Sequence, residues 1–346
     1  MKKINRMGLK AFVAEHITNS GNDQRLGVLS AGKQLMDLTE DTNSGISLSS
    51  VSIRDLFESL CNANGTVDTT SAQEIHEAMT AANFPAVTGA LINPVIIRDF
   101  EPFATPVLQL VTETEAKHKT ETHVGFGALD SFELVREGAP YDEAQPGQRK
   151  VQIENFKFGR VISVTMEIVL FDQTGDVLRQ AGAIGKKAGQ HLHRLIVETV
   201  CDQTRQATGD NNNLVVDGTR RAIYADDHSS WDSYANDNIG AGGGNTITDA
   251  TLLVALNLFN GILDDKGDRI LITPTTLLCD KAAEVRARQL LASPNLAYTG
   301  STDATKNTNN PWYNAYNVLA SPFTDSGGWY LGDPKLQFLL QWVYRL

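Results

Sequence analysis

Residues 126–206 read FGALDSFELVREGAPYDEAQPGQRKVQIENFKFGRVISVTMEIVLFDQTGDVLRQAGAIGKKAGQHLHRLIVETVCDQTRQ, and the spacing of their apolar residues changes along the chain. The first part is polar and carries two turn-forming clusters, Glu137-Gly138-Ala139-Pro140-Tyr141 and Gln145-Pro146-Gly147-Gln148. A segment this polar cannot bury itself in a core. It therefore predicts a long two-stranded loop that projects from the rest of the protein over residues 126–158.

The two patterns that follow the loop predict a strand and then a helix. From Ile162 to Leu170 the even-numbered residues are apolar and the residues between them are mostly polar, which is typical of a half-buried β-strand. From Val177 onward small and apolar residues recur at steps of three and four, which predicts a helix with one face against a core. If this helix continues to Gln206, it is ~45 Å long at about 1.5 Å per residue. The predicted packing residues are Ala181, Ile184, Ala188, Leu192 and Leu195.

The composition argues for a protein with a hydrophobic core and against broad binding to nucleic acid. Of the 346 residues 41% are hydrophobic, but no apolar run approaches the ~20 residues of a membrane span. Residues 1–10 are basic with no apolar stretch behind them, so no signal peptide is expected and the chain is interpreted as soluble and cytosolic. The formal net charge of -11 opposes nonspecific contact with phosphates.

Helical and strand-like patterns alternate through the second half of the chain. Thr248 is placed to cap a helix over 246–259. A strand over 269–273 and a helix over 276–291 would complete an α+β unit. The inward residues of that second helix are expected to be Leu278, Ala282 and Val285.

The two ends of the chain carry weaker patterns. Residues 26–38 and 52–61 are interpreted as short helices of an amino-terminal arm. Residues 336–344 alternate between apolar and other side chains, which predicts a final strand.

Histidine and cysteine residues do not converge on a catalytic or metal site in the sequence. His191 and His193 are two positions apart, so on a helix they diverge by about 200°, whereas helical metal ligands stand three or four apart. Both are interpreted as part of a solvated helix face. The three cysteines are odd in number and far apart, which predicts buried free thiols rather than disulfides or nucleophiles: Cys61, Cys201 and Cys279.

Three polar stretches invite a ligand interpretation, and each is more simply a turn or a hinge. His228 stands beside Asp226 and Asp227, but no second His or Cys follows at zinc spacing. Residues 242–244 are glycines without the Lys and Ser or Thr of a phosphate-binding loop. Residues 264–268 lack the alternating acids and the closing Glu of a calcium loop. We therefore expect no cofactor, no metal and no enzymatic activity.

The order of these elements resembles that of a known family. Polar loop, strand, Phe171-Asp172-Gln173-Thr174-Gly175 turn and long helix are similar to the extended loop, peripheral domain and spine helix of tailed-bacteriophage major capsid proteins, in particular their Mu-like and protease-fused prophage branch. The resemblance covers roughly Ser71 to the carboxyl end. Further matching segments are Thr80-Ala81-Ala82-Asn83-Phe84-Pro85-Ala86-Val87, Tyr224-Ala225-Asp226-Asp227-His228 with Trp231, Ile270-Leu271-Ile272-Thr273-Pro274 and Gly328-Trp329-Tyr330-Leu331-Gly332-Asp333-Pro334.

The resemblance implies an α+β fold, the tailed-phage major capsid fold, in five parts. These are an amino-terminal arm with the start of the peripheral domain (1–125), an extended β-hairpin loop (126–158), the peripheral domain with its spine helix (159–214), an axial domain (215–321) and return strands of the peripheral domain (322–346).

The resemblance also implies a structural function. Copies of the chain would form the pentamers and hexamers of an icosahedral virion shell, which would assemble in the bacterial cytoplasm. The shell would enclose DNA without binding it sequence-specifically. Scaffold or protease, portal and decoration proteins would be its partners. The extended loop would lie across an adjacent subunit through Glu137, Gly138, Pro140, Tyr141, Pro146, Gly147, Arg149 and Lys150.

Two other functions remain open from the sequence. An encapsulin-like compartment has a similar fold but encloses a cargo enzyme; the long amino-terminal arm and the Phe84-Pro85 segment argue against it. A soluble enzyme could place a site in the Gly- and Asp-rich region 226–245, but no acid, base and nucleophile converge there.

Overall fold

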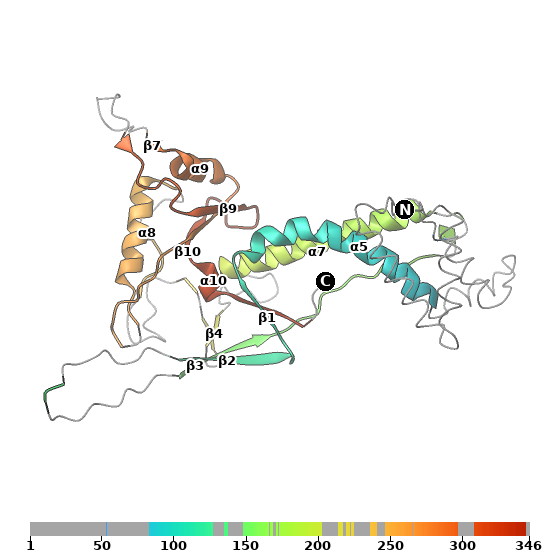
Figure 1. Cartoon of the computed structure of the whole chain (residues 1–346), viewed down its shortest axis with the longest axis horizontal. Helices are drawn as coiled ribbons and strands as arrows, with labels where there is room; N and C mark the ends of the chain where they lie inside the picture. The colour runs from blue at the N-terminus through green and yellow to red at the C-terminus, as the bar shows by residue number, and fades with distance from the viewer. Residues whose placement is uncertain are drawn as a thin grey trace. The chain divides into compact units, whose positions relative to one another are not determined.

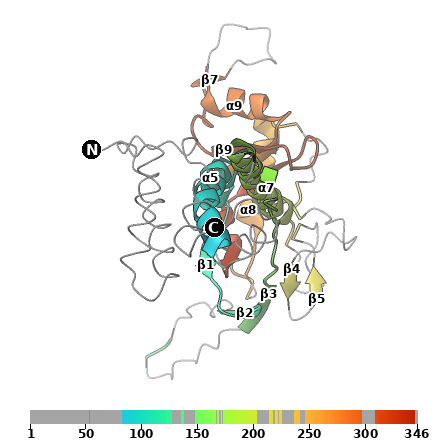
Figure 2. The ribbon, with the colours of Figure 1, turned by 90° about the vertical axis from the view of Figure 1, so that its right-hand side faces the viewer.

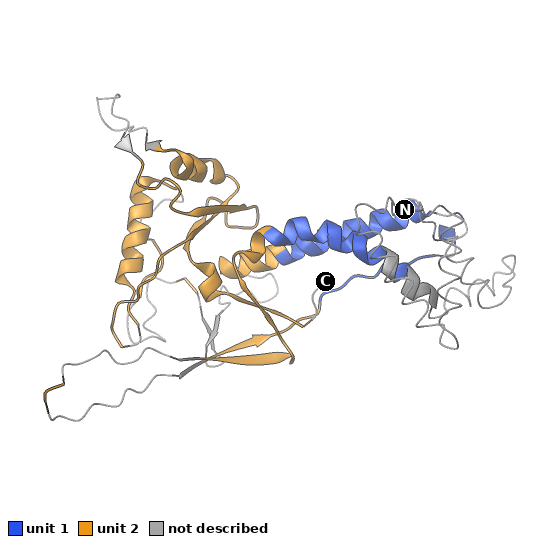
Figure 3. Ribbon diagram, in the orientation of Figure 1, with its two compact units in different colours: residues 1–105, 158–192, 346 blue, residues 106–157, 193–345 orange. Residues whose placement is uncertain are grey.

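The computed structural model combines helices and strands in an α+β fold (Figure 1). It describes residues 53, 83–126, 135–137, 148–165, 167–168, 171, 173–202, 214–216, 219–221, 223–224, 236–240, 246–264, 266–296 and 308–343. The chain divides into two compact units (Figure 3). Unit 1 holds residues 1–105, 158–192 and 346, and unit 2 holds 106–157 and 193–345.

Two long helices supply much of what is described of unit 1, and Figures 1 and 2 show them side by side. They are α5 (Asn83–Leu108) and α7 (Thr174–Val200). The predicted helix is confirmed as α7, which begins before Val177 and ends at Val200 rather than Gln206. At about 1.5 Å per residue it is ~40 Å long. Just beyond its end, Asp202 has a φ of 50°, the left-handed conformation that commonly follows a helix.

The face of α7 that meets α5 is built from glycine. Of the predicted packing residues, Ala181 and Leu192 are buried, while Ile184, Ala188 and Leu195 are half-buried. The closest approach lies at Gly182, Gly185 and Gly189, which the spacing of apolar residues did not mark. A Cβ at Gly185 would lie 2.4 Å from the Ile96 carbonyl oxygen, and one at Gly189 2.7 Å from that of Phe100. Only glycine allows the two backbones to come this close.

Helix α5 was not predicted from the sequence. Beyond its first turn it contains Pro94, Pro102 and Pro106, and proline in a helix interior costs about 3 kcal/mol. Tertiary burial outweighs that cost, because α5 places apolar side chains in the interior of unit 1. Its buried apolar residues in this unit are Ile92, Val95 and Ala104.

The strand predicted over 162–170 is wrong for the residues described. Residues 155–165 have no assigned secondary structure, and residues 167–168 are helical. The alternation itself is real, since Ile162 and Val164 are half-buried while Ser163 and Thr165 are exposed. A strand also needs the backbone of a neighbouring strand, which the sequence pattern cannot supply.

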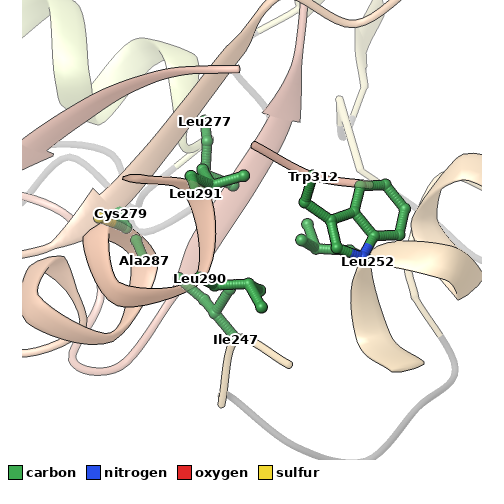
Figure 4. Close-up of a cluster of buried hydrophobic side chains, with 8 residues drawn as sticks. All are labelled: Ile247, Leu252, Leu277, Cys279, Ala287, Leu290, Leu291 and Trp312. Carbon is green, nitrogen blue, oxygen red and sulfur yellow. The ribbon is translucent and has the colours of Figure 1, made fainter. Parts of the chain in front are cut away.

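Unit 2 is built around a three-stranded sheet in the order β10-β6-β9. The central strand β6 (Thr276–Asp280) pairs antiparallel with β10 (Trp329–Gly332) and parallel with β9 (Asn317–Ser321). Helices α8 (Asp249–Gly261) and α9 (Glu284–Ala292) contribute side chains to the same core. Its buried residues, drawn in Figure 4, are Ile247, Leu252, Leu277, Cys279, Ala287, Leu290, Leu291 and Trp312.

The helix predicted over 276–291 is a strand followed by a shorter helix. A short run of buried apolar residues fits a central strand and a buried helix equally well, and here Leu277, Leu278 and Cys279 are all buried in β6. The predicted inward positions Ala282 and Val285 are consequently exposed. The strand predicted over 269–273 is also wrong, because Arg269 makes only an isolated bridge with Leu263.

A second sheet of unit 2 carries a long hairpin. Its order is β2-β3-β4-β5, with β2 (Thr120–Phe126) and β3 (Gln148–Glu154) antiparallel over their full length. The short strands β4 (Leu214–Val216) and β5 (Thr219–Arg221) follow on one side. The remaining pair, β7 (Asn295–Leu296) and β8 (Thr308–Asn309), is also antiparallel.

The end of the chain pairs with a strand far from it in sequence. Strand β11 (Leu339–Trp342) runs parallel to β1 (Thr112–Glu115) in a two-stranded sheet. The final strand was predicted to begin at Leu336, but Pro334–Gln337 form the short helix α10, and Leu336 is exposed. Within the described ranges, no helix is long and apolar enough to span a membrane.

Replacing Thr248 with Ala should destabilise unit 2 by about 1 kcal/mol, because the Thr248 hydroxyl caps α8. The predicted cap is confirmed: Thr248 Oγ1 accepts from the Thr251 backbone N–H, and Thr251 Oγ1 accepts in return from the Thr248 N–H at 2.9 Å. Denaturant unfolding of Thr248→Ala and Thr248→Ser measures the effect. Equal losses for both variants would contradict a capping role, since Ser keeps the hydroxyl.

Candidate interaction surface

The predicted two-stranded loop has an antiparallel hairpin at its base. The register pairs Thr120 with Glu154 at one end of β2 and β3 and Phe126 with Gln148 at the other. Beyond Glu154, the Asn155 N–H donates to the Lys119 carbonyl at 2.7 Å, and Asn155 Nδ2 donates to the His118 carbonyl at 2.8 Å. The hairpin is therefore held at its base by backbone and side-chain bonds.

The turn that leads into β2 is held by a carboxylate. Glu121 Oε1 accepts from the backbone N–H groups of Lys117 and His118 at 2.7 and 3.2 Å. These bonds favour the charged form, so the pKa of Glu121 is lowered from its ordinary value. The nearby ion pair between Lys119 and Glu154 is exposed to solvent and contributes little.

The predicted loop residues fall partly within this hairpin. Arg149 and Lys150 lie in β3, opposite Gly125 and Val124. Glu137 is exposed. The others lie outside the described residues: Gly138, Pro140, Tyr141, Pro146 and Gly147.

Directly after the hairpin, residues 156–165 form what we call the connecting segment. Phe156, Phe158 and Val161 are 65%, 60% and 93% exposed. The Phe158 ring meets the His191 ring of α7 at a centroid distance of 4.6 Å in an edge arrangement. These residues were not predicted as a surface from the sequence, although the apolar alternation can be followed back to Phe156.

Unit 2 also exposes large apolar side chains. On α8, Leu253 and Val254 are exposed although the helix has Leu252 on its buried side. Further exposed apolar side chains of unit 2 are Leu271, Val285, Tyr313 and Leu336. Where such side chains form a contiguous surface, they mark contacts with other molecules, whereas single exposed apolar residues are common.

The two cysteines that the structure describes are poor nucleophiles. Both thiols are free and buried, as predicted, and Cys61 lies outside the described residues. Burial, with the charge of Asp325 adding to it, raises the pKa of Cys201 to about 12. Burial likewise raises the pKa of Cys279 to about 11. At neutral pH almost none of either thiol is present as the reactive thiolate.

The stability of unit 2 should therefore fall as the pH rises above 9. The ordinary thiol pKa is 9.0 and that of Cys201 in the fold is about 12, so between these values the unfolded chain has lost a proton that the folded chain keeps. The unfolded state then binds fewer protons, and stability declines by up to about 1.4 kcal/mol per pH unit and thiol. Denaturant unfolding across this range should show a shallower decline for Cys201→Ala. The same slope for both proteins would rule out Cys201 as the group responsible.

The histidines of α7 occupy different surroundings. His191 is exposed, as predicted for a solvated face. The prediction of a solvated side chain is wrong for His193, which is half-buried. Its Nε2 lies 2.9 Å from Ser321 Oγ, and its ring meets that of Phe323. It thus contacts the turn after β9. In the part of the chain that the structure describes, no group of three potential metal ligands occurs.

A partly buried polar cluster lies at the end of α7 in unit 2. Tyr330 Oη donates to Asp325 Oδ2 at 3.1 Å, and Tyr224 Oη donates to the Val200 carbonyl at 2.7 Å. Burial raises the pKa of both phenols. Since the two rings lie 5.3 Å apart and their hydroxyl groups are engaged, the cluster is structural.

Of the three polar stretches considered as ligand sites, the structure describes only the one at residues 264–268, apart from residue 265. Asp264 Oδ1 accepts from the backbone N–H groups of Lys266 and Asp268, each at 2.9 Å, so this stretch is the predicted turn. His228 and glycines 242–244 lie outside the described residues.

Comparison with known proteins adds one positive finding. A family model described as phage capsid protein matches residues 150–344, more than half of the 346-residue chain. No curated protein matches the chain. The matched range includes α7, most of β3 and the whole three-stranded sheet of unit 2.

Proposed function

The chain belongs to the phage capsid protein family, and from that premise we propose that it is the major subunit of an icosahedral shell, forming pentamers and hexamers around double-stranded DNA. The family match over residues 150–344 is the observation that carries this proposal. A structural capsid role in the virion follows from the family itself. The ring sizes, the enclosed DNA, assembly in the host cytoplasm and a Mu-like affiliation are the proposed part.

The chemistry of the described residues supports a role through surfaces. The two described thiols are held protonated by burial, and large apolar side chains are exposed in both units. When a second molecule covers exposed apolar side chains, association is favoured by roughly 25 cal/mol for each Å² of apolar surface that is removed from water. Repeated over many copies, such contacts favour a closed shell.

Each predicted domain has a proposed task in the shell. The loop over 126–158 would lie across a neighbouring subunit, and α7 would organise the peripheral domain. Residues 215–321 would meet their copies around the capsomer axis. The exposed Leu253 and Val254 of α8 lie in that range and suit such a contact.

The partners follow from the same proposal. A scaffold or protease, a portal and decoration proteins would join the shell. The net charge of -11 suits packaged DNA that is held without sequence-specific contacts, because an acidic lining repels phosphates.

Electron microscopy and light scattering of the purified chain at high concentration test the proposal. We expect rings, tubes or closed shells. A compact monomer at every concentration would overturn it. Particles that always contain one cargo enzyme and accept no DNA would instead favour an encapsulin-like compartment.

A further inference from the structure

We propose that the connecting segment of one copy of the chain forms a strand along the open edge of β1 in a second copy, with Arg160 against Glu115. This inference rests on the proposed function, since a shell places many copies side by side. It names a contact distinct from that of the loop tip.

The first observation is a strand pattern without a strand partner. The backbone groups of residues 156–164 make no bond to another backbone group in the part of the chain that the structure describes. Their even-numbered side chains are nevertheless apolar apart from Arg160. Such a segment gains its missing hydrogen bonds by adding to an exposed sheet edge, as extended peptides do.

The second observation is a sheet too small to be complete. Within the described residues strand β1 pairs only with β11, and two strands alone are marginally stable. The N–H groups of Thr112 and Ala116 donate to carbonyls at the two ends of β11. Backbone N–H groups of successive residues in a strand point to opposite edges, so the N–H of Glu115 points to the edge of β1 that faces away from β11. The Glu115 side chain is exposed and has no ion pair among the described residues.

Charge selects β1 among the open edges of the described sheets. The connecting segment carries Lys157 and Arg160 and no acid, whereas β1 reads TETE. The edge strand β5 reads TRR and would repel the segment, while β7, β8, β9, β10 and β11 carry no charge. The edge strand β2 has one carboxylate, Glu121, which two backbone N–H groups already engage.

The faces of the two strands also match. Arg160 is the charged residue on the otherwise apolar side of the segment, where a carboxylate can hold its guanidinium by two parallel bonds. In the β1–β11 register, Glu115 is opposite Trp342, and Glu113 is opposite Leu340. With Arg160 beside Glu115, the apolar side chains of the segment lie on the same face as Leu340 and Trp342, because side chains alternate along strands.

Charge reversal tests the pairing, with assembled particles measured by sedimentation and microscopy. Arg160→Glu and Glu115→Arg should each lower particle yield at least tenfold, because like charges then face each other in every copy of the contact. Lys157→Glu is the matched control, with the same charge change on the opposite side of the segment, and should assemble like the parent chain. Circular dichroism should show all variants folded, since Arg160 and Glu115 are exposed without partners in the described chain.

Mixing the variants separates contacts between copies from contacts within one. In an equimolar mixture the glutamate introduced by Arg160→Glu meets the arginine introduced by Glu115→Arg. The unchanged Arg160 of one variant likewise meets the unchanged Glu115 of the other, so particles should return. Recovery in the double variant of one chain but not in the mixture would place the pair within a single copy and overturn the inference. Normal assembly of Arg160→Glu would overturn it as well. If the parent chain itself does not assemble, the proposed function fails instead.

Discussion

Replacing residues 127–147 with a two-residue Asn-Gly turn should leave the subunit folded and abolish assembly of the shell. Phe126 and Gln148 are the last pair of the β2–β3 register, so a short turn can close the hairpin at that point. The bonds that hold its base, from Asn155 to Lys119 and His118, stay in place. The removed stretch includes Val135, Arg136 and Glu137, which are exposed. We therefore expect the melting temperature to change little.

The loss of assembly follows from repetition. If the loop crosses a neighbouring subunit, its removal weakens every copy of one contact, and a shell combines many copies. Calorimetry and electron microscopy of the same preparation separate the two effects. A matched control exchanges the stretch for a Gly- and Ser-rich sequence of equal length, which keeps the reach but removes the side chains. Normal shells from the shortened variant would refute the loop assignment, and so would loss of the fold.

Replacing Gly185 with Ala should lower the melting temperature of the chain, although Ala is the better helix former. The added Cβ would stand 2.4 Å from the Ile96 carbonyl oxygen and 3.1 Å from its carbonyl carbon. Because these are backbone atoms of α5, no side-chain rotation relieves the clash and one helix must move. Overpacking of this kind costs roughly 1–3 kcal/mol. At about 2–4 °C per kcal/mol the shift is several degrees.

Gly175→Ala is the control for this prediction. It makes the same substitution in the same helix, but no atom lies within 4 Å of its added Cβ. It should be neutral or stabilise by up to about 1 kcal/mol, since Ala loses less backbone entropy than Gly. Thermal unfolding of the two variants gives opposite signs if the glycine contact is real. Equal shifts would show that α5 and α7 do not depend on it.

Several elements could be predicted from the sequence because their signals are local. The three-to-four spacing from Val177 onward predicted α7, and Thr248 before an apolar helix predicted the cap of α8. Two turn-forming clusters in a polar segment predicted a two-stranded loop, and the β2–β3 hairpin lies at its base. The order of these elements was sufficient to suggest the capsid family, which the match over residues 150–344 confirms.

The candidate interaction surface was predicted only in part. The turn clusters pointed to the loop, since polar residues cannot form a core. The exposure of Phe156, Phe158 and Val161 could not be predicted, because an apolar side chain usually finds cover within its own chain. The same alternation fits a buried strand and an unpaired one, and the difference depends on which backbone lies alongside.

Some elements were decided only by the tertiary structure, because their conformation depends on segments that are distant in sequence. Residues 276–280 form a strand because β9 and β10 lie on either side, although the same apolar run fits a helix. Helix α5 forms despite its prolines because unit 1 buries Ile92 and Val95, and α7 lies close to it because Gly185 has no side chain. Strands β1 and β11 pair although most of the chain separates them. A local pattern fixes the period of a segment, whereas burial and hydrogen bonds to remote backbone decide which conformation has the lower free energy.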